Sequence, residues 1–206
     1  VDTDVAGNLD GYTQCDLTDY DQVKKLPLRG VSAVINLAGL AAVGPSFDNP
    51  NLYLRVNTGV LDTLCRSAIE QNAIDLRIIS ISSGAVYKSG QPMPLTESSQ
   101  LDPTSSPYAK SKIAMEDLAR RYREEGLDCV VARPFNHIGP GQSRGFLLPD
   151  LYDKVMIAHG KGENVRVGNL TTRRDYTDVR DVARAYVALV TSGLLSSDLY
   201  NVCSGR

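Results

Sequence analysis

Short apolar runs alternate along the chain with longer stretches whose apolar residues recur at helical spacing. The short runs predict strands at residues 31–39, 76–84, 129–134 and 199–203. The longer stretches predict helices at residues 52–68, 108–123 and 178–191. Pro107 and Gly126 flank the second helix, as helix ends favour. Strands that alternate with helices form βαβ units, so we expect an α/β fold with a doubly wound parallel sheet.

The carboxyl ends of the predicted strands carry small or polar residues, at positions 37–39, 82–84 and 134–136. A segment rich in Pro, Ser and Thr, residues 88–106, is expected to form a surface loop over these ends. Ligands of open α/β sheets bind beyond the carboxyl ends of the strands. We therefore expect the functional site at this edge of the sheet.

Composition narrows the range of partners. The 206 residues carry a net charge of −2, with no basic excess that would point to nucleic acid or to a membrane surface. No apolar run approaches the ~20 residues that span a bilayer. The cysteines are far apart and have no metal-ligand spacing: Cys15, Cys65, Cys129 and Cys203. We expect reduced thiols, no metal site and a cytoplasmic location.

Tyr108 and Lys112 are four residues apart, which on a helix places both on one face. A lysine ammonium near a phenol lowers the pKa of the phenol, and such a tyrosine can donate and accept a proton. Ser83 ends a predicted strand upstream and could hold a carbonyl oxygen beside them. The alternative is a serine that caps a turn, with Tyr108 and Lys112 on the surface. Tyr20 and Lys24 share the spacing without such a serine, and we interpret them as a solvated helix face.

Several motifs, in order, resemble the extended short-chain dehydrogenase/reductases that act on nucleotide sugars. Residues 82–87 and 106–112 carry the resemblance, and the segments 16–17, 36–39, 55–60, 133–136 and 173–182 agree with it. The resemblance implies a Rossmann-like fold with part of a small C-terminal substrate domain. It divides the chain into an incomplete dinucleotide-binding domain, residues 1–135, and a partial substrate-binding region, residues 136–206, interleaved with the first.

The resemblance also implies roles for individual residues. Tyr108 would protonate a developing alkoxide, Ser83 would hydrogen-bond its oxygen, and Lys112 would bind the nicotinamide ribose. The implied contacts to NADP or NAD are Asp16, Leu17, Leu37, Ala38, Gly39, Asn57, Ser82, Tyr108, Lys112 and Pro134. The implied contacts to the substrate are Ser83, Gly84, Asn136 and Arg174.

The implied reaction is hydride transfer from NADPH or NADH to the C4 ketone of a GDP-4-dehydro-6-deoxy-hexose. Dehydration is disfavoured, because dehydratases of the family carry an acidic residue where this chain has Gly84 and Ala85. A nucleotide-sugar 4-epimerase, which uses the same three residues, is the alternative enzyme. A catalytically inactive fragment or a nucleotide-sugar-binding protein is the alternative of another class. Relatives usually form homodimers, through helices that correspond here to residues 52–68 and 108–123.

The glycine-rich Gly-x-x-Gly-x-x-Gly turn that begins the family's fold has no counterpart in the sequence. By the resemblance, Val1 and Asp2 stand at the end of the second strand of that fold. We therefore expect roughly 35–45 further residues before the chain and about 60 after it. Only Asp2 and Asp4 fall near the place that selects NAD or NADP, which leaves that choice open.

Overall fold

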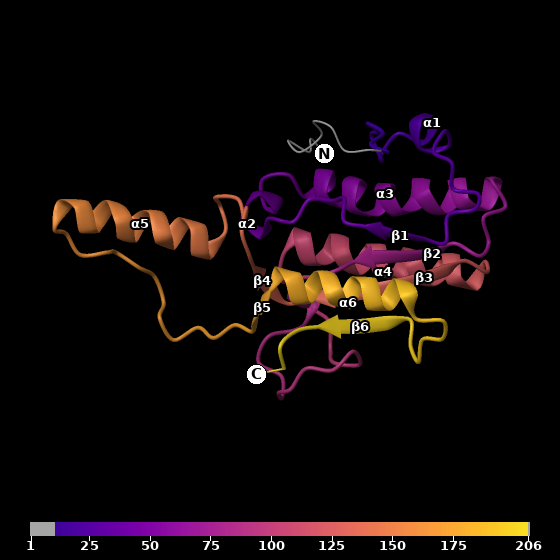
Figure 1. Ribbon diagram of the computed structural model, residues 1–206. Helices are drawn as coiled ribbons and strands as arrows, with labels where there is room; N and C mark the ends of the chain where they lie inside the picture. The colour runs from indigo at the N-terminus through magenta and orange to yellow at the C-terminus, as the bar shows by residue number, and fades with distance from the viewer. Residues whose placement is uncertain (1–10, 206) are drawn as a thin grey trace.

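The computed structural model describes residues 11–205, and within them the main sheet is parallel and four-stranded, in the order β1–β2–β3–β6 (Figure 1). The strands are β1 (Ala33–Asn36), β2 (Arg77–Ile81), β3 (Asp128–Pro134) and β6 (Leu199–Val202). The expectations for Val1, Asp2 and Asp4 lie outside the described residues. The prediction of an α/β fold with a parallel sheet is confirmed.

Helices cover both faces of this sheet. Successive residues of β2 point to opposite faces, and Ile78 packs with α3 (Pro50–Glu70) and α4 (Pro107–Glu124). Ile79 packs instead with α6 (Val179–Thr191). The two cores lie on opposite faces of the central strands. The helices α4 and α6 begin at the edge of the sheet where the carboxyl ends of the strands lie (Figure 1).

Local sequence fixes where α4 begins. The Oγ atom of Ser106 accepts a hydrogen bond of 3.0 Å from the backbone N–H of Ala109, which caps the helix. Pro107 occupies the first helical position, where its missing N–H costs nothing. These two residues place Tyr108 in the first turn of α4, next to the end of β2.

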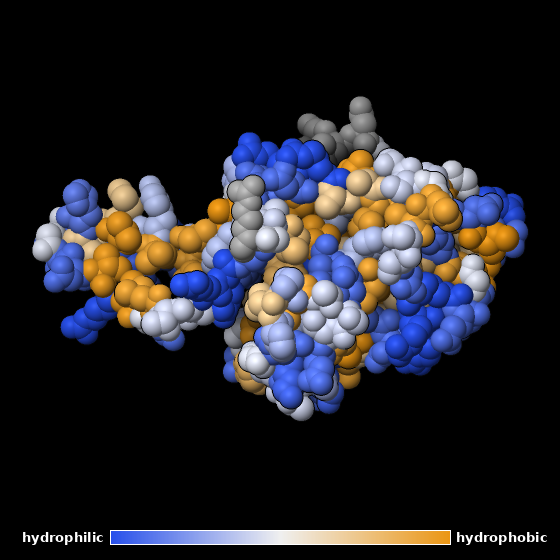
Figure 2. Space-filling view, turned by 90° about the horizontal axis from the view of Figure 1, so that it is seen from below, coloured by the Kyte–Doolittle hydropathy of each residue, from blue (hydrophilic) through white to orange (hydrophobic). Residues whose placement is uncertain are grey.

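The second half of the chain leaves the main sheet and returns to it. A small parallel sheet pairs β4 (Asn136–Ile138) with β5 (Tyr176–Asp178). Between them, α5 (Leu147–Lys161) projects from the body as an arm (Figure 1). Apolar side chains gather along this arm (Figure 2), among them the exposed Leu147, Val155, Met156 and Ile157.

The predicted helices at residues 52–68, 108–123 and 178–191 are confirmed as α3, α4 and α6. The strand predicted at residues 76–84 ends at Ile81, and the chain then turns into the short helix η1 (Gly84–Val86). Elements absent from the prediction are α1 (Tyr20–Val23), α2 (Val43–Ser46), β4, α5 and β5. Across residues 11–205, no helix is both long enough and apolar enough to cross a membrane.

Candidate active site

Ser83, Tyr108 and Lys112 converge at the carboxyl end of β2. The Oγ atom of Ser83 accepts a hydrogen bond of 3.1 Å from the N–H of Ala85, and the Ser83 side chain acts to lower the pKa of the Tyr108 hydroxyl. Tyr108 is 6% exposed and Lys112 is 7% exposed, so neither is a surface residue. Ser83 therefore caps the turn, as the alternative interpretation expected, and contacts Tyr108 as well.

The side chain of Lys112 reaches the carboxyl end of β2. Its Nζ atom donates a hydrogen bond of 2.8 Å to the carbonyl oxygen of Ile81 and lies 5.9 Å from the centroid of the Tyr108 ring. Burial lowers the pKa of Lys112 to about 8, against the opposing charge of Glu116, which raises it. The ammonium is thus held beside the phenol in a poorly solvated position.

The pKa of Tyr108 is raised, not lowered. Burial is the main cause, the hydrogen bond from Ser83 acts in the opposite direction, and Tyr53 raises the pKa further. The rings of Tyr53 and Tyr108 meet edge to face, with centroids 6.4 Å apart. The expectation that Lys112 lowers this pKa is wrong for the chain described here, because loss of solvent around the phenol dominates.

The chain at Gly39 lies close to Asn57 and to Lys112, a member of the Ser83–Tyr108–Lys112 triad. A Cβ atom on Gly39, whose φ is +156°, would lie 2.7 Å from Asn57 Oδ1 and 3.6 Å from Lys112 Nζ. The side chain of the buried Asn57 accepts a hydrogen bond of 2.8 Å from the N–H of Leu40 and donates one of 3.2 Å to the carbonyl of Leu40. It also donates to Ser111 Oγ at 2.8 Å. The chain after β1 therefore approaches α3 and α4 as closely as only glycine permits.

A buried charged network lies beneath the triad. The carboxylate of Glu116 accepts hydrogen bonds from Arg133 at 2.6 and 2.9 Å and from the hydroxyl of Ser82. Arg133 also donates to the Tyr87 hydroxyl at 2.9 Å, and that hydroxyl donates to Asn201 at 2.6 Å. Sequence reasoning missed Glu116, although its position four residues after Lys112 places it on the same helix face.

The other expected cofactor contacts spread along the same edge. Leu37, just beyond β1, is 68% exposed, and Ala38 packs partly buried against α3. Pro134 is the buried last residue of β3. The Asp16 carboxylate accepts a hydrogen bond from the N–H of Thr18, and the Leu17 carbonyl accepts one from Thr63 of α3.

The expected substrate contacts fall into two groups. Gly84 lies beside the triad, where an added Cβ would sit 3.0 Å from the Phe135 ring. Asn136 is exposed on β4, in register with Tyr176, two positions after Arg174. Arg174 is exposed, and its guanidinium donates to the carbonyl of Arg173 at 2.7 Å. The small sheet thus pairs Asn136 with Tyr176, and Arg174 precedes that strand by two positions.

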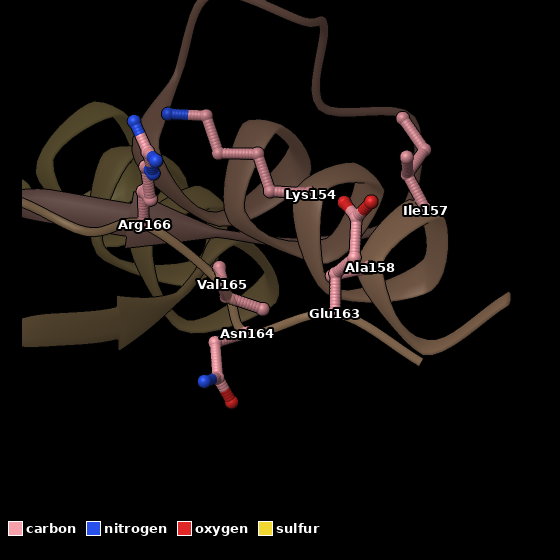
Figure 3. Close-up of a pocket in the computed structure, with 7 residues that line it drawn as sticks. All are labelled: Lys154, Ile157, Ala158, Glu163, Asn164, Val165 and Arg166. Carbon is pink, nitrogen blue, oxygen red and sulfur yellow. The ribbon is translucent and has the colours of Figure 1, made fainter. Parts of the chain in front are cut away.

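A separate hollow of about 360 Å³ lies at the C-terminal end of α5. Lys154 and Arg166 extend toward the same side of it (Figure 3), and Glu163 also lines it. Its lining residues come from α5 and the segment that follows, and include no member of the triad.

A Rossmann-type parallel sheet that carries Ser, Tyr and Lys at its carboxyl edge defines a class of nicotinamide-dependent enzymes. The model of the NAD dependent epimerase/dehydratase family matches residues 3–203, and the chain belongs to that family. The sequence is 36% identical over 196 residues to the GDP-6-deoxy-D-mannose reductase of Pseudomonas aeruginosa. That match covers 93% of this chain and 64% of the reductase, so the chain spans somewhat under two thirds of that relative.

Two solved structures agree in fold. The structure of RMD from Pseudomonas aeruginosa complexed with NADPH has a TM-score of 0.82 and 34% identity, covering 94% of this chain and 66% of that one. The UDP-glucose 4-epimerase of Bifidobacterium longum, in complex with NAD+ and UDP, has a TM-score of 0.79 and 26% identity, covering 94% and 63%. The first of these structures thus holds NADPH and the second holds NAD+.

Proposed function

We propose that this protein is a nucleotide-sugar reductase, which transfers a hydride from NADPH or NADH to the C4 ketone of a GDP-4-dehydro-6-deoxy-hexose. The observation that carries the proposal is the convergence of Ser83, Tyr108 and Lys112 at the carboxyl end of β2. Similarity to the GDP-6-deoxy-D-mannose reductase supports the choice of substrate class.

Tyr108 is the proton donor in this proposal. A phenol with a raised pKa keeps its proton at neutral pH and can pass it to the alkoxide that forms at C4. Ser83, whose side chain acts to lower the pKa of Tyr108, is assigned to the same oxygen. Lys112, whose ammonium lies 5.9 Å from the centroid of the Tyr108 ring, is assigned to the cofactor.

The chain's own groups fit a nicotinamide ribose at this edge. Lys112 has three N–H donors and directs one of them to Ile81, so it can donate to ribose hydroxyls. The exposed Leu37 offers an apolar surface just beyond the end of β1. A bound nicotinamide supplies the hydride. We assign Asp16, Leu17, Ala38, Gly39, Asn57, Ser82 and Pro134 to the same cofactor side.

Ketone reduction suits this edge better than dehydration. Gly84 faces the Phe135 ring so closely that an acidic side chain at that position would displace the ring. Asn136 and Arg174 are assigned to the sugar and the diphosphate, since arginine binds phosphate oxygens in a fixed two-pronged geometry.

A nucleotide-sugar 4-epimerase is the second candidate, favoured by the likeness to an epimerase in complex with NAD+ and UDP. An assay for cofactor consumption tests the two proposals. A reductase oxidises one NADPH or NADH for each 4-keto sugar reduced, whereas an epimerase ends with its cofactor unchanged. A protein that binds the nucleotide sugar and does neither would be an inactive fragment or a binding protein.

We further propose a homodimer formed through α3 and α4, the division into residues 1–135 and 136–206, and a cytoplasmic location. The free thiols of Cys15, Cys65, Cys129 and Cys203 support the location. The return of α6 and β6 to the main sheet supports the interleaving of the two regions.

A further inference from the structure

Glu116 is a buried acid with no part in the proposed chemistry. It follows Lys112 by one helical turn on α4, and its side chain is 10% exposed. Its Oε1 atom accepts from Arg133 Nε at 2.9 Å and from the Ser82 hydroxyl, and its Oε2 atom accepts from Arg133 Nη2 at 2.6 Å. The carboxylate of Glu116, on α4, therefore bonds the end of β3 and the residue that directly follows β2.

The two strand positions that Glu116 holds are adjacent to the proposed site. Ser82 immediately precedes Ser83, and its N–H donates to Ala132 of β3 at 2.7 Å. Arg133, at the end of β3, is 3% exposed and lies with its guanidinium 4.9 Å from the Tyr87 ring centroid. A shift of the Glu116 carboxylate would move the backbone that carries Ser83 relative to the helix that carries Tyr108 and Lys112.

Stability alone gives little reason for this arrangement. A buried ion pair loses its hydration, and well-packed apolar residues of similar size often serve stability as well or better. Glu116 also acts on a second group: burial lowers the pKa of Lys112, and the charge of Glu116 partly offsets that effect. The Glu116–Arg133 pair therefore brings a charge that also acts on Lys112.

We propose that Glu116 is a positioning residue, which ties the ends of β2 and β3 to α4 and places a negative charge one helical turn from Lys112. The proposal rests on the proposed function, because the geometry it maintains is that of Ser83, Tyr108 and Lys112. It names a residue that acts through its neighbours and does not itself touch the substrate.

The test is the titration of Lys112, followed by ¹³C NMR of lysine side chains labelled at Cε, with K112M used to assign the signal. The variant E116Q keeps the size of the side chain and removes the charge, and E124Q makes the same change on an exposed part of α4. We expect E116Q to lower the Lys112 midpoint by about one pH unit and E124Q to leave it unchanged. An unchanged midpoint in E116Q overturns the proposal.

A second variant keeps the proposal testable if E116Q does not fold. E116D retains the charge on a side chain too short to reach both strands. We expect amide hydrogen exchange at Ser82 to accelerate about tenfold more than at Ile79 in the strand centre. Equal changes at both positions would indicate a purely structural role and overturn the proposal. Neither measurement needs turnover, so failure of the reductase assay leaves this test intact.

Discussion

The Nζ atom of Lys112 donates a 2.8 Å hydrogen bond to the carbonyl oxygen of Ile81, in a site where burial lowers the lysine pKa to about 8. The ordinary pKa of 10.5 applies to the unfolded chain. Below pH 8 Lys112 is protonated in both the folded and the unfolded protein, and folding bears the full cost of burying its charge. Between pH 8 and 10.5 only the unfolded state holds it, so stability rises with pH, and above 10.5 the cost is gone.

The first prediction concerns Lys112→Met. The difference between the two pKa values corresponds to about 3 kcal/mol, and the lost bond to Ile81 offsets about 1 kcal/mol of this. We expect the variant to raise the free energy of unfolding at pH 7 by about 1–2 kcal/mol. Urea unfolding at pH 7 and pH 10, with the exposed Lys110→Met as control, measures it. A variant that is less stable at pH 7 would contradict the assignment of the charge cost.

A second prediction concerns Gly39→Ala. Its Cβ would lie 2.7 Å from Asn57 Oδ1, so the amide must move and its bonds to Leu40 weaken. We expect a loss of about 1–3 kcal/mol in the free energy of unfolding. Gly44→Ala, which meets no atom within 4 Å, is the control and should change it by under about 0.5 kcal/mol. Similar melting temperatures for the two variants would refute the close approach.

A third prediction follows from the ion pair beneath the site. Arg133→Met leaves the Glu116 carboxylate buried without its partner, at a cost of about 3–5 kcal/mol in unfolding free energy. The double variant Arg133→Met/Glu116→Leu should recover much of that loss, because no unpaired charge remains. The exposed pair Asp117–Arg120 gives the comparison, with a coupling below about 1 kcal/mol. Purely additive effects of the two core substitutions would argue against the coupling.

A fourth prediction concerns Ser83→Ala. The hydrogen bond from Ser83 lowers the pKa of Tyr108 within a site where burial raises it, so its loss should raise that pKa further. Ultraviolet titration of tyrosinate, with Tyr108→Phe identifying the signal, measures the change, and the exposed Ser89→Ala serves as control. An unchanged or lower Tyr108 pKa in Ser83→Ala would remove the support for a shared Ser–Tyr bond.

The sequence predicted the central strands and helices because their signals are local. The apolar run around Ile78, and Pro107 and Gly126 at the ends of α4, need no distant partner to be recognised. The Tyr108–Lys112 spacing likewise predicted a shared helix face. The arm α5 was not predicted, since its apolar residues lie on an exposed helix rather than against the main core.

The electrostatics of the site could not be predicted from spacing. Whether Lys112 lowers or fails to lower the Tyr108 pKa depends on how deeply both groups are buried and on where Nζ points. The partner of Glu116 is Arg133, seventeen positions away, and only the packing of β3 against α4 brings them together. Such contacts are set by tertiary structure.

The central claim is that Tyr108 is the proton donor for reduction of a sugar ketone. The most direct measurement is the loss of reduced nicotinamide absorbance when the protein is mixed with NADPH and a GDP-4-dehydro-6-deoxy-hexose, repeated with NADH. The account predicts consumption equal to the sugar reduced, a rate about 10²- to 10⁴-fold lower for Tyr108→Phe, and an unchanged rate for Tyr152→Phe on the exposed arm. Equal rates for Tyr108→Phe and the wild-type protein would contradict it.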